Sequence, residues 1–245
     1  MKNLFLLALI LLTANPALAR VEESYRPDKI ADLTLIYNRV TPASRAADME
    51  FVKGMTPHHA GALTMSEEYL NNPGASSPTL KKLARGIIHN QKFEIGMLAA
   101  IHTLAEKPLA EIGEYRAVAV QGLAQNQKFI FAPMPDSFGL RGENISAADV
   151  AFAKGMIVHH QGAVDMAHDY LNNPNATNNY LRLMCNDIIT DQSQEIALME
   201  AVISAYPGDA AAVKPAKVHG MDHMGHGKDN KTRDCGHTKP DSHKH

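Results

Sequence analysis

Apolar residues recur at alternating steps of four and three positions in four stretches of the chain, a spacing that predicts four amphipathic helices. The first stretch carries Phe51, Met55, His58, Ala62, Met65 and Tyr69. The second carries Leu80, Ala84, Ile87, Gln91, Glu94, Leu98, Ile101 and Ala105. The third carries Phe152, Met156, His159, Ala163, Met166 and Tyr170. The fourth carries Leu181, Cys185, Ile188, Gln192, Glu195, Met199, Val202 and Tyr206. Each stretch therefore has one helical face to bury.

The third and fourth stretches repeat the first and second. The segment DMEFVKGMTPHH at residues 48–59 recurs as DVAFAKGMIVHH at residues 149–160, and both copies continue to an Asn-Asn-Pro that stops a helix. Each copy predicts an αα-hairpin, and two hairpins can bury each other's apolar faces. We predict an all-α fold: a four-helix bundle built from two duplicated αα-hairpins, with a long connection compatible with ferritin-like connectivity and a flexible His/Met-rich C-terminal tail.

Composition sets the expected boundaries. Residues 1–19 combine Lys2, an apolar run and Ala17-Leu18-Ala19, which predicts a signal peptide and a periplasmic location. The bundle is expected over residues 20–206, with repeat one at about 45–105, a linker at about 106–145 and repeat two at about 146–206. The linker offers a helix around residues 109–123. Residues 207–245, rich in Gly, Pro, Lys and His, predict a disordered metal-binding tail.

Polar residues interrupt all four apolar faces at one level. Pairing each hairpin about its turn places them in a single layer of Met55, His58, Gln91, Glu94, Met156, His159, Gln192 and Glu195. His59 and His160 fall roughly 100° around their helices, at the edge of the same face. A buried polar network is the alternative interpretation, but an unpartnered buried polar group costs roughly 1–3 kcal/mol. We therefore favour a metal site over a purely structural network.

The side-chain types favour copper. Thioether and imidazole together suit Cu(I), and imidazole also binds Cu(II), whereas zinc gains little from methionine. A second set of such donors lies in the tail at His219, Met221, His223, Met224 and His226. A di-iron bundle would need more carboxylates and a Glu-x-x-His on the helices, which the chain lacks on these faces.

Other features narrow the function. The net charge of −2 argues against a nucleic-acid partner, and no membrane insertion is expected after signal cleavage. Two cysteines are too few for a disulfide framework, and a Cys185–Cys235 bridge stays an open alternative to two free thiols. Pro57 removes an amide donor within the first helix, whereas its counterpart is Val158, so the two halves should differ locally.

The repeated motif Phe-x-x-Gly-Met-x-x-His-His-x-x-Ala, at residues 51–62 and nearly so at 152–163, resembles the signature of domain-of-unknown-function family 305. The resemblance covers about residues 46–205. It implies a ferritin-like helical bundle, periplasmic copper binding and a role in copper tolerance. The matching positions are Met55, His58, His59, Met65, Met156, His159, His160 and Met166.

The sequence therefore predicts a periplasmic protein that sequesters or delivers copper ions, with copper efflux or acceptor proteins as further partners and no catalytic residue. Two alternatives stay open. One is a metal-dependent oxidase of Cu(I) or Fe(II), with Glu94 and Glu195 as bridging carboxylates. The other is a structural or partner-binding bundle whose polar layer only fixes the helix register.

Overall fold

The computed structural model describes residues 41–106, 110–112, 115–117 and 130–221, and the predicted signal peptide lies outside them. Four long helices dominate the described chain: α1 (Pro42–Leu70), α2 (Pro78–Ala105), α3 (Ala147–Asn172) and α4 (Asn179–Ser204). Two short strands, β1 (Ala110–Ile112) and β2 (Tyr115–Ala117), and the 3-10 turns η2 (Ser137–Leu140) and η3 (Ala210–Ala212) complete the described elements.

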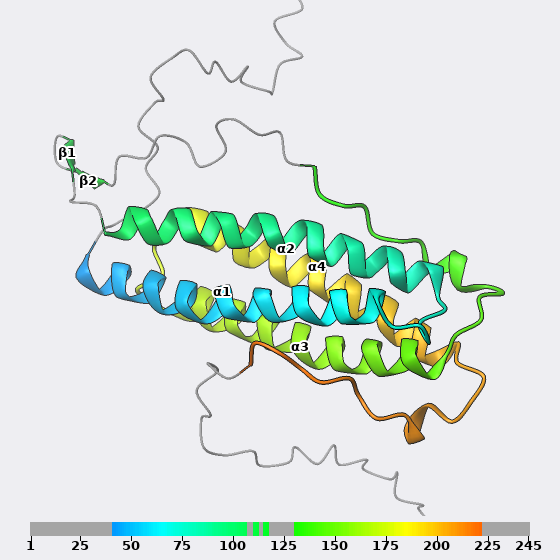
Figure 1. The fold of residues 1–245 in the computed structure, drawn as a ribbon. Helices are drawn as coiled ribbons and strands as arrows, with labels where there is room; N and C mark the ends of the chain where they lie inside the picture. Colours follow the sequence, from blue (N-terminus) through cyan, green and yellow to red (C-terminus); the bar gives the residue numbers. More distant parts are fainter. Residues whose placement is uncertain (1–40, 107–109, 113–114, 118–129, 222–245) are drawn as a thin grey trace, which may run out of the picture.

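The helices form the predicted four-helix bundle. α1 packs along α2 and α3 along α4, so that each sequence repeat is one αα-hairpin. α1 also packs against α3, less extensively than each helix packs against its hairpin partner, whereas α2 and α4 touch much less. Figure 1 shows α1 and α3 running in opposite directions, and α2 ending at the other end of the bundle from the start of α3. The connection between the hairpins must therefore return along the length of the bundle.

Local sequence fixes where the helices begin. Thr41 caps α1 through a reciprocal pair of hydrogen bonds with Ser44, and Pro42 occupies the first turn, where its missing amide is harmless. Ser146 and Asp149 form the same capping box at the start of α3. The side chain of Asn178 accepts two backbone amides at the start of α4.

The apolar core consists of two clusters on either side of the histidine positions. One cluster is built around Tyr69, Leu80, Ile87, Phe152, Met156 and Met199, and the other around Phe51, Met55, Leu98, Ile101, Leu181 and Ile188. His58 follows Met55 on α1, and His159 follows Met156 on α3, so the histidines fall between the clusters along each helix. Each fully buried Leu, Ile, Phe or Met contributes about 1.5–3 kcal/mol to folding.

The linker contains strands where a helix was expected. β1 and β2 pair antiparallel, with Ala110 opposite Ala117 and Ile112 opposite Tyr115, so the expected helix over residues 109–123 is wrong at these positions. Antiparallel pairing of Ala110–Ile112 with Tyr115–Ala117 is incompatible with a continuous helix through these positions.

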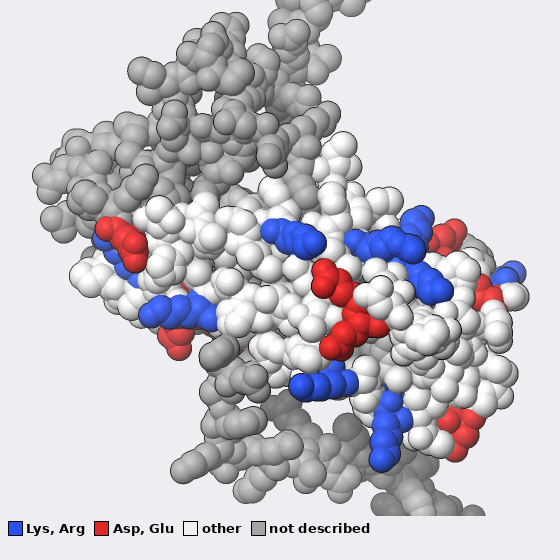
Figure 2. Space-filling view, viewed as in Figure 1, with Lys and Arg blue, Asp and Glu red and all other residues white. Residues whose placement is uncertain are grey.

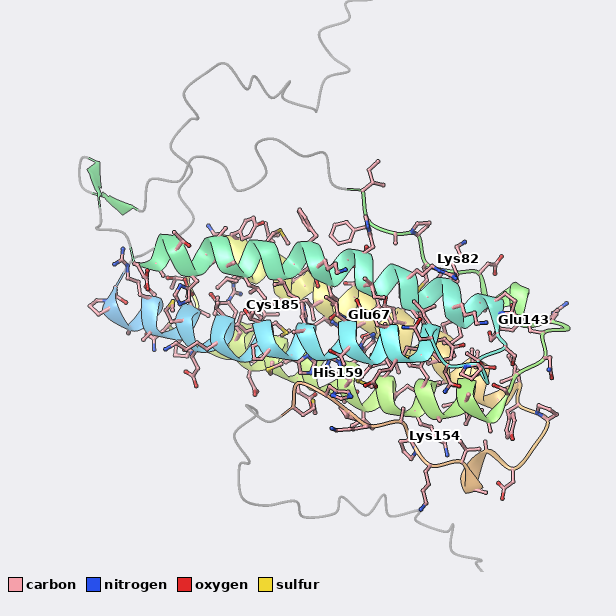
Figure 3. The ribbon with its side chains drawn as sticks, in the orientation of Figure 1. Glu67, Lys82, Glu143, Lys154, His159 and Cys185 are labelled. Carbon is pink, nitrogen blue, oxygen red and sulfur yellow. The ribbon has the colours of Figure 1, made fainter. Side chains whose placement is uncertain are left out.

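The first part of the C-terminal region also differs from the expected flexible tail. Residues 207–221, here called the C-terminal strap, follow a defined path over α1 and α3 (Figure 1). Lys154 donates hydrogen bonds from Nζ to the carbonyls of Ala210 and Val213, and Figure 3 shows it beside the strap. The Ala216 amide donates to the Ala151 carbonyl at 2.7 Å. Backbone hydrogen bonds hold this segment although its composition resembles that of a linker.

The face of the molecule drawn in Figure 2 carries charges of both signs. Figure 2 shows lysine and arginine side chains interspersed with aspartate and glutamate on one face, in keeping with the net charge of −2. No helix in the described part of the chain is long and apolar enough to cross a membrane.

Glycine at position 61 allows the strap to approach α1. A methyl group there would collide with the His219 carbonyl, whereas one at Gly96 would meet open space. We expect Gly96→Ala to stabilise the fold by about 0.5–1 kcal/mol through helix propensity. Gly61→Ala should instead lower the stability and speed amide exchange across the strap, as measured by urea unfolding and hydrogen exchange. Equal stabilisation by both variants would contradict this role for the strap.

Candidate metal centre

Four histidines from the two repeats lie together in the bundle interior, and all four are fully buried. The rings of His58 on α1 and His159 on α3 stack across the interface between the repeats, with centroids 3.8 Å apart and an interplanar angle of 38°. His159 also donates a hydrogen bond from Nε2 to the His58 carbonyl at 2.9 Å. Figure 3 shows His159 near the middle of the bundle, on the α1–α3 side.

Each of the other two histidines faces a glutamate of its own hairpin. His59 Nε2 lies 2.9 Å from Glu94 Oε2, and His160 Nε2 lies 2.7 Å from Glu195 Oε2. Both distances are in hydrogen-bond range, but neither ring nitrogen meets the angular requirement for a hydrogen bond. The two pairs are close polar contacts in which a carboxylate favours a proton on the facing Nε2.

Many polar side-chain atoms of this layer make no hydrogen bond within the described chain. Nine of the eleven buried side-chain nitrogen and oxygen atoms without a hydrogen bond belong to the four histidines, Gln91 and Gln192. Native interiors leave few such atoms, and each costs about 1–3 kcal/mol. Their concentration in one layer makes these side chains candidate ligands for a bound ion. This donor set, mostly imidazole nitrogen, fits a borderline or soft cation.

The side chains do not form a finished coordination sphere in the structure. Among the described residues, no three His, Cys, Asp or Glu side chains converge closely enough to hold one ion. Binding would therefore require the imidazole rings to turn about their side-chain bonds within the layer.

Burial keeps the central imidazoles neutral. The pKa of His58 falls to about 3 because burial disfavours the charged ring, with His59 and His160 adding to the effect. The pKa of His159 falls to about 2, again chiefly by burial and then by the neighbouring His58 and His160. A neutral imidazole keeps a free lone pair, which is the form that binds a metal.

The methionine candidates lie next to this layer along the helices. Met55 and Met156 are fully buried one helical turn before His58 and His159. The Met166 sulfur lies against Gly54 of α1, close enough that a β-carbon at position 54 would touch it at 3.5 Å. Met65 lies under the strap, where it lines a small cavity. Thioethers thus flank the imidazoles rather than alternate with them.

The tail candidates are only partly described. His219 Nε2 lies 3.2 Å from Glu68 Oε2 on α1, and Met221 is the last described residue. The remaining candidates, His223, Met224 and His226, lie outside the described residues, as does Cys235. Cys185 is a buried thiol in the apolar core, and burial raises its pKa to about 12.

Two details of the expected layer are different in the structure. His59 and His160 were expected at the edge of the apolar face, but both are fully buried. The glutamates face these two histidines rather than His58 and His159. Pairing residues about a hairpin turn gives the right level in the bundle, but it does not fix the rotation of each helix.

Sequence analysis missed the contacts that align the two repeats. Tyr170 donates a hydrogen bond to Asp48 at 2.6 Å, and Tyr69 donates one to Asp149 at the same distance. Asn178 adds a second donor to Asp48. These two Tyr–Asp clamps tie α1 to α3 at both ends of their interface. All four residues occupy duplicated positions, and that repetition was the signal available.

Comparison with known proteins gives one finding. A family model described as "Domain of unknown function (DUF305)" matches residues 48–203, which span both hairpins. No curated protein and no solved structure matches significantly.

The Tyr–Asp clamps yield a stability prediction. Tyr170→Phe keeps the ring contact with Phe51 but removes the hydroxyl that donates to the buried Asp48 carboxylate. We expect it to lower the free energy of unfolding by about 1–3 kcal/mol in urea titrations. Tyr206→Phe, at a partly exposed position, is the matched control and should change little. Equal effects of the two variants would contradict the clamp.

The depressed histidine pKa values predict a pH dependence. His58 and His159 bind protons in the unfolded chain near pH 6.5 but in the fold only near pH 3 and 2. Stability of the metal-free protein should therefore fall as the pH drops below about 6.5, by up to about 1.4 kcal/mol per pH unit for each histidine. Asp191, whose pKa is raised to about 6 by burial and then Glu195 and Glu94, acts in the opposite direction.

Comparing the parent with His58→Gln/His159→Gln isolates the histidine effect, because Asp191 is present in both proteins. In urea unfolding between pH 7 and 4.5, the free energy of unfolding should fall more steeply with decreasing pH in the parent than in the variant. Parallel pH profiles would refute the burial of neutral imidazoles.

Proposed function

The chain belongs to the DUF305 family, and from its buried histidine layer we propose that it is a periplasmic copper-binding protein that sequesters or delivers copper ions. The observation that carries this proposal is the set of four buried imidazoles, contributed equally by the two repeats, with several unpartnered nitrogens. The proposed role is binding and transfer, and it needs no catalytic step.

The contacts indicate which ring nitrogen each histidine would offer. His59 and His160 turn Nε2 toward a glutamate, and His159 turns Nε2 toward the His58 carbonyl. An oxygen at Nε2 favours the tautomer with its proton there, which leaves the Nδ1 lone pair for the metal. The Nδ1 atoms of all three rings are buried and unpartnered.

In this arrangement Glu94 and Glu195 are positioning residues rather than the main ligands. Carboxylates that accept from a metal-bound histidine orient the ring and raise its basicity. Met55 and Met156 supply thioethers one turn away, which would favour Cu(I), while the imidazoles serve Cu(I) and Cu(II) alike. The strap holds His219 against α1, where its Nε2 lies 3.2 Å from Glu68 Oε2, so this imidazole is a donor separate from the buried layer.

Two sequence features support the cellular role. The pattern of residues 1–19 is that of a signal peptide, which would carry the chain out of the cytoplasm to the periplasm of the proposed role. The His/Met-rich residues after 218 add donors of the same chemical types as the bundle.

The direct test is copper titration of the mature chain against a competing chelator, under reducing and oxidising conditions. The parent should bind copper in the bundle and gain thermal stability, about 2.7 kcal/mol when free copper is a hundred times its dissociation constant. Replacing His58, His59, His159 and His160 with glutamine should abolish the bundle component. His102→Gln/His168→Gln, away from the layer, should bind as the parent does.

The rival functions give different results in the same experiment. Oxygen uptake on adding Cu(I) or Fe(II), lost in Glu94→Gln/Glu195→Gln, would favour an oxidase. A melting temperature that changes neither with added copper nor with a chelator would favour a structural or partner-binding bundle. If the four-glutamine variant binds copper as the parent does, the binding site lies in the tail alone, and the bundle site is refuted.

A further inference from the structure

A cleft between α2 and α4, on the side opposite the strap, is lined by Glu195, the glutamate that faces His160. Gly86 and Asn90 line it from α2, Asp191 and Glu195 line it from α4, and residues 131–135 of the linker cover it. The cover is held by the Ala132 amide, which donates to the Asn90 side chain at 2.8 Å. The cleft follows from the sparse contact between α2 and α4.

His160, which lies next to the cleft residue Glu195, is a buried candidate ligand. Glu195 lines the cleft and lies 2.7 Å from His160 Nε2. His160 is fully buried, and neither of its ring nitrogens has a hydrogen bond. A cation that enters the cleft and reaches Glu195 would therefore lie next to the His160 imidazole, whose buried Nδ1 has no hydrogen bond.

Two of the residues that line this cleft, Asp191 and Glu195, are acidic, and further carboxylates lie near enough to act on Asp191. Asp191 is partly buried, and its pKa is raised to about 6 by burial and then by Glu195, Glu94 and Asp187. Burial and then Glu94 also raise the pKa of Asp187. Every charged group that raises the pKa of Asp191 is thus another carboxylate. Like charges held together at the mouth of a low-dielectric cleft attract cations and focus their approach.

The acidic approach is particular to the second repeat. Asp187 and Asp191 correspond, by the offset between the histidine pairs, to Gly86 and Asn90 of the first repeat. Asn90 holds the cover and Gly86 leaves room beneath it, since a β-carbon there would only touch Ala132. The two otherwise duplicated halves therefore differ where the cleft opens.

We infer that this cleft is the access route by which a copper ion reaches His160, and that Asp191 is the residue that draws the ion in. The inference rests on the proposed copper-binding function and adds its route: the ion passes the carboxylates of the cleft before it reaches His160. Asp191 acts on the rate of loading, whereas the histidines set the amount bound.

The test is stopped-flow loading of Cu(II), followed by quenching of tyrosine fluorescence. The full-length mature chain would carry alanine at the six histidines after residue 218, so that only bundle donors report. Asp191→Asn reproduces the residue of the first repeat, and Gly86→Leu fills the cleft. Glu200→Gln removes one charge from the opposite face of α4, and Gly96→Leu adds the same side chain to α2 in open space.

Both cleft variants should load about 3- to 10-fold more slowly than the parent, with unchanged stoichiometry at equilibrium. The difference in loading rate between Asp191→Asn and the parent should shrink in high salt because it is electrostatic. The difference between Gly86→Leu and the parent should persist because it is steric. The two control variants should load at the parental rate.

The outcomes separate the two proposals. A parent that binds copper, with both cleft variants loading at its rate, overturns the access route and leaves the proposed function standing. Equal slowing by Asp191→Asn and Glu200→Gln also overturns it, because overall charge would then explain the rates. A parent that binds no copper in the bundle refutes the proposed function and the route together.

Discussion

The interior of this bundle depends on how it accommodates four imidazoles that cannot reach water. His59 and His160 are each placed against a glutamate of the same hairpin, and His58 and His159 stack on each other between the hairpins. These contacts leave most ring nitrogens without a hydrogen bond. An apolar core of the same shape would avoid that cost, and this is the reason for proposing a ligand at the layer.

The rest of the fold holds this layer in register. The apolar clusters on either side supply the burial, and the Tyr–Asp clamps at the two ends of the α1–α3 interface fix how the repeats slide against each other. Because the clamps and the His–Glu pairs obey the same duplication, the site is nearly two-fold symmetric. Pro57, the strap and the acidic cleft break that symmetry, each on one side only.

Much of this architecture could be predicted from the sequence. The spacing of apolar residues predicted the four helices, and the duplication predicted that each repeat forms one hairpin. Ser146 and Asp149 predicted where α3 begins. The level of the polar layer was also predictable, since it follows from counting residues back from each hairpin turn. These features depend on local spacing, which a single sequence displays directly.

The remaining features depend on contacts between distant segments. Whether His58 or His59 faces Glu94 is set by helix rotation, which side-chain packing decides. The path of residues 207–221 depends on small side chains at Gly61 and Gly155, which admit its backbone, and composition alone predicted disorder there. The strands at Ala110–Ile112 and Tyr115–Ala117 are too short for their pattern to outweigh a helical one.

The central claim is that buried imidazoles of both repeats bind copper, and X-ray absorption of the copper-loaded chain tests it most directly. With the tail histidines replaced by alanine, the account predicts the multiple-scattering pattern of imidazole around copper. That pattern should disappear when His58, His59, His159 and His160 are replaced with glutamine. A spectrum without imidazole, or one that the glutamine substitutions leave unchanged, would contradict the account.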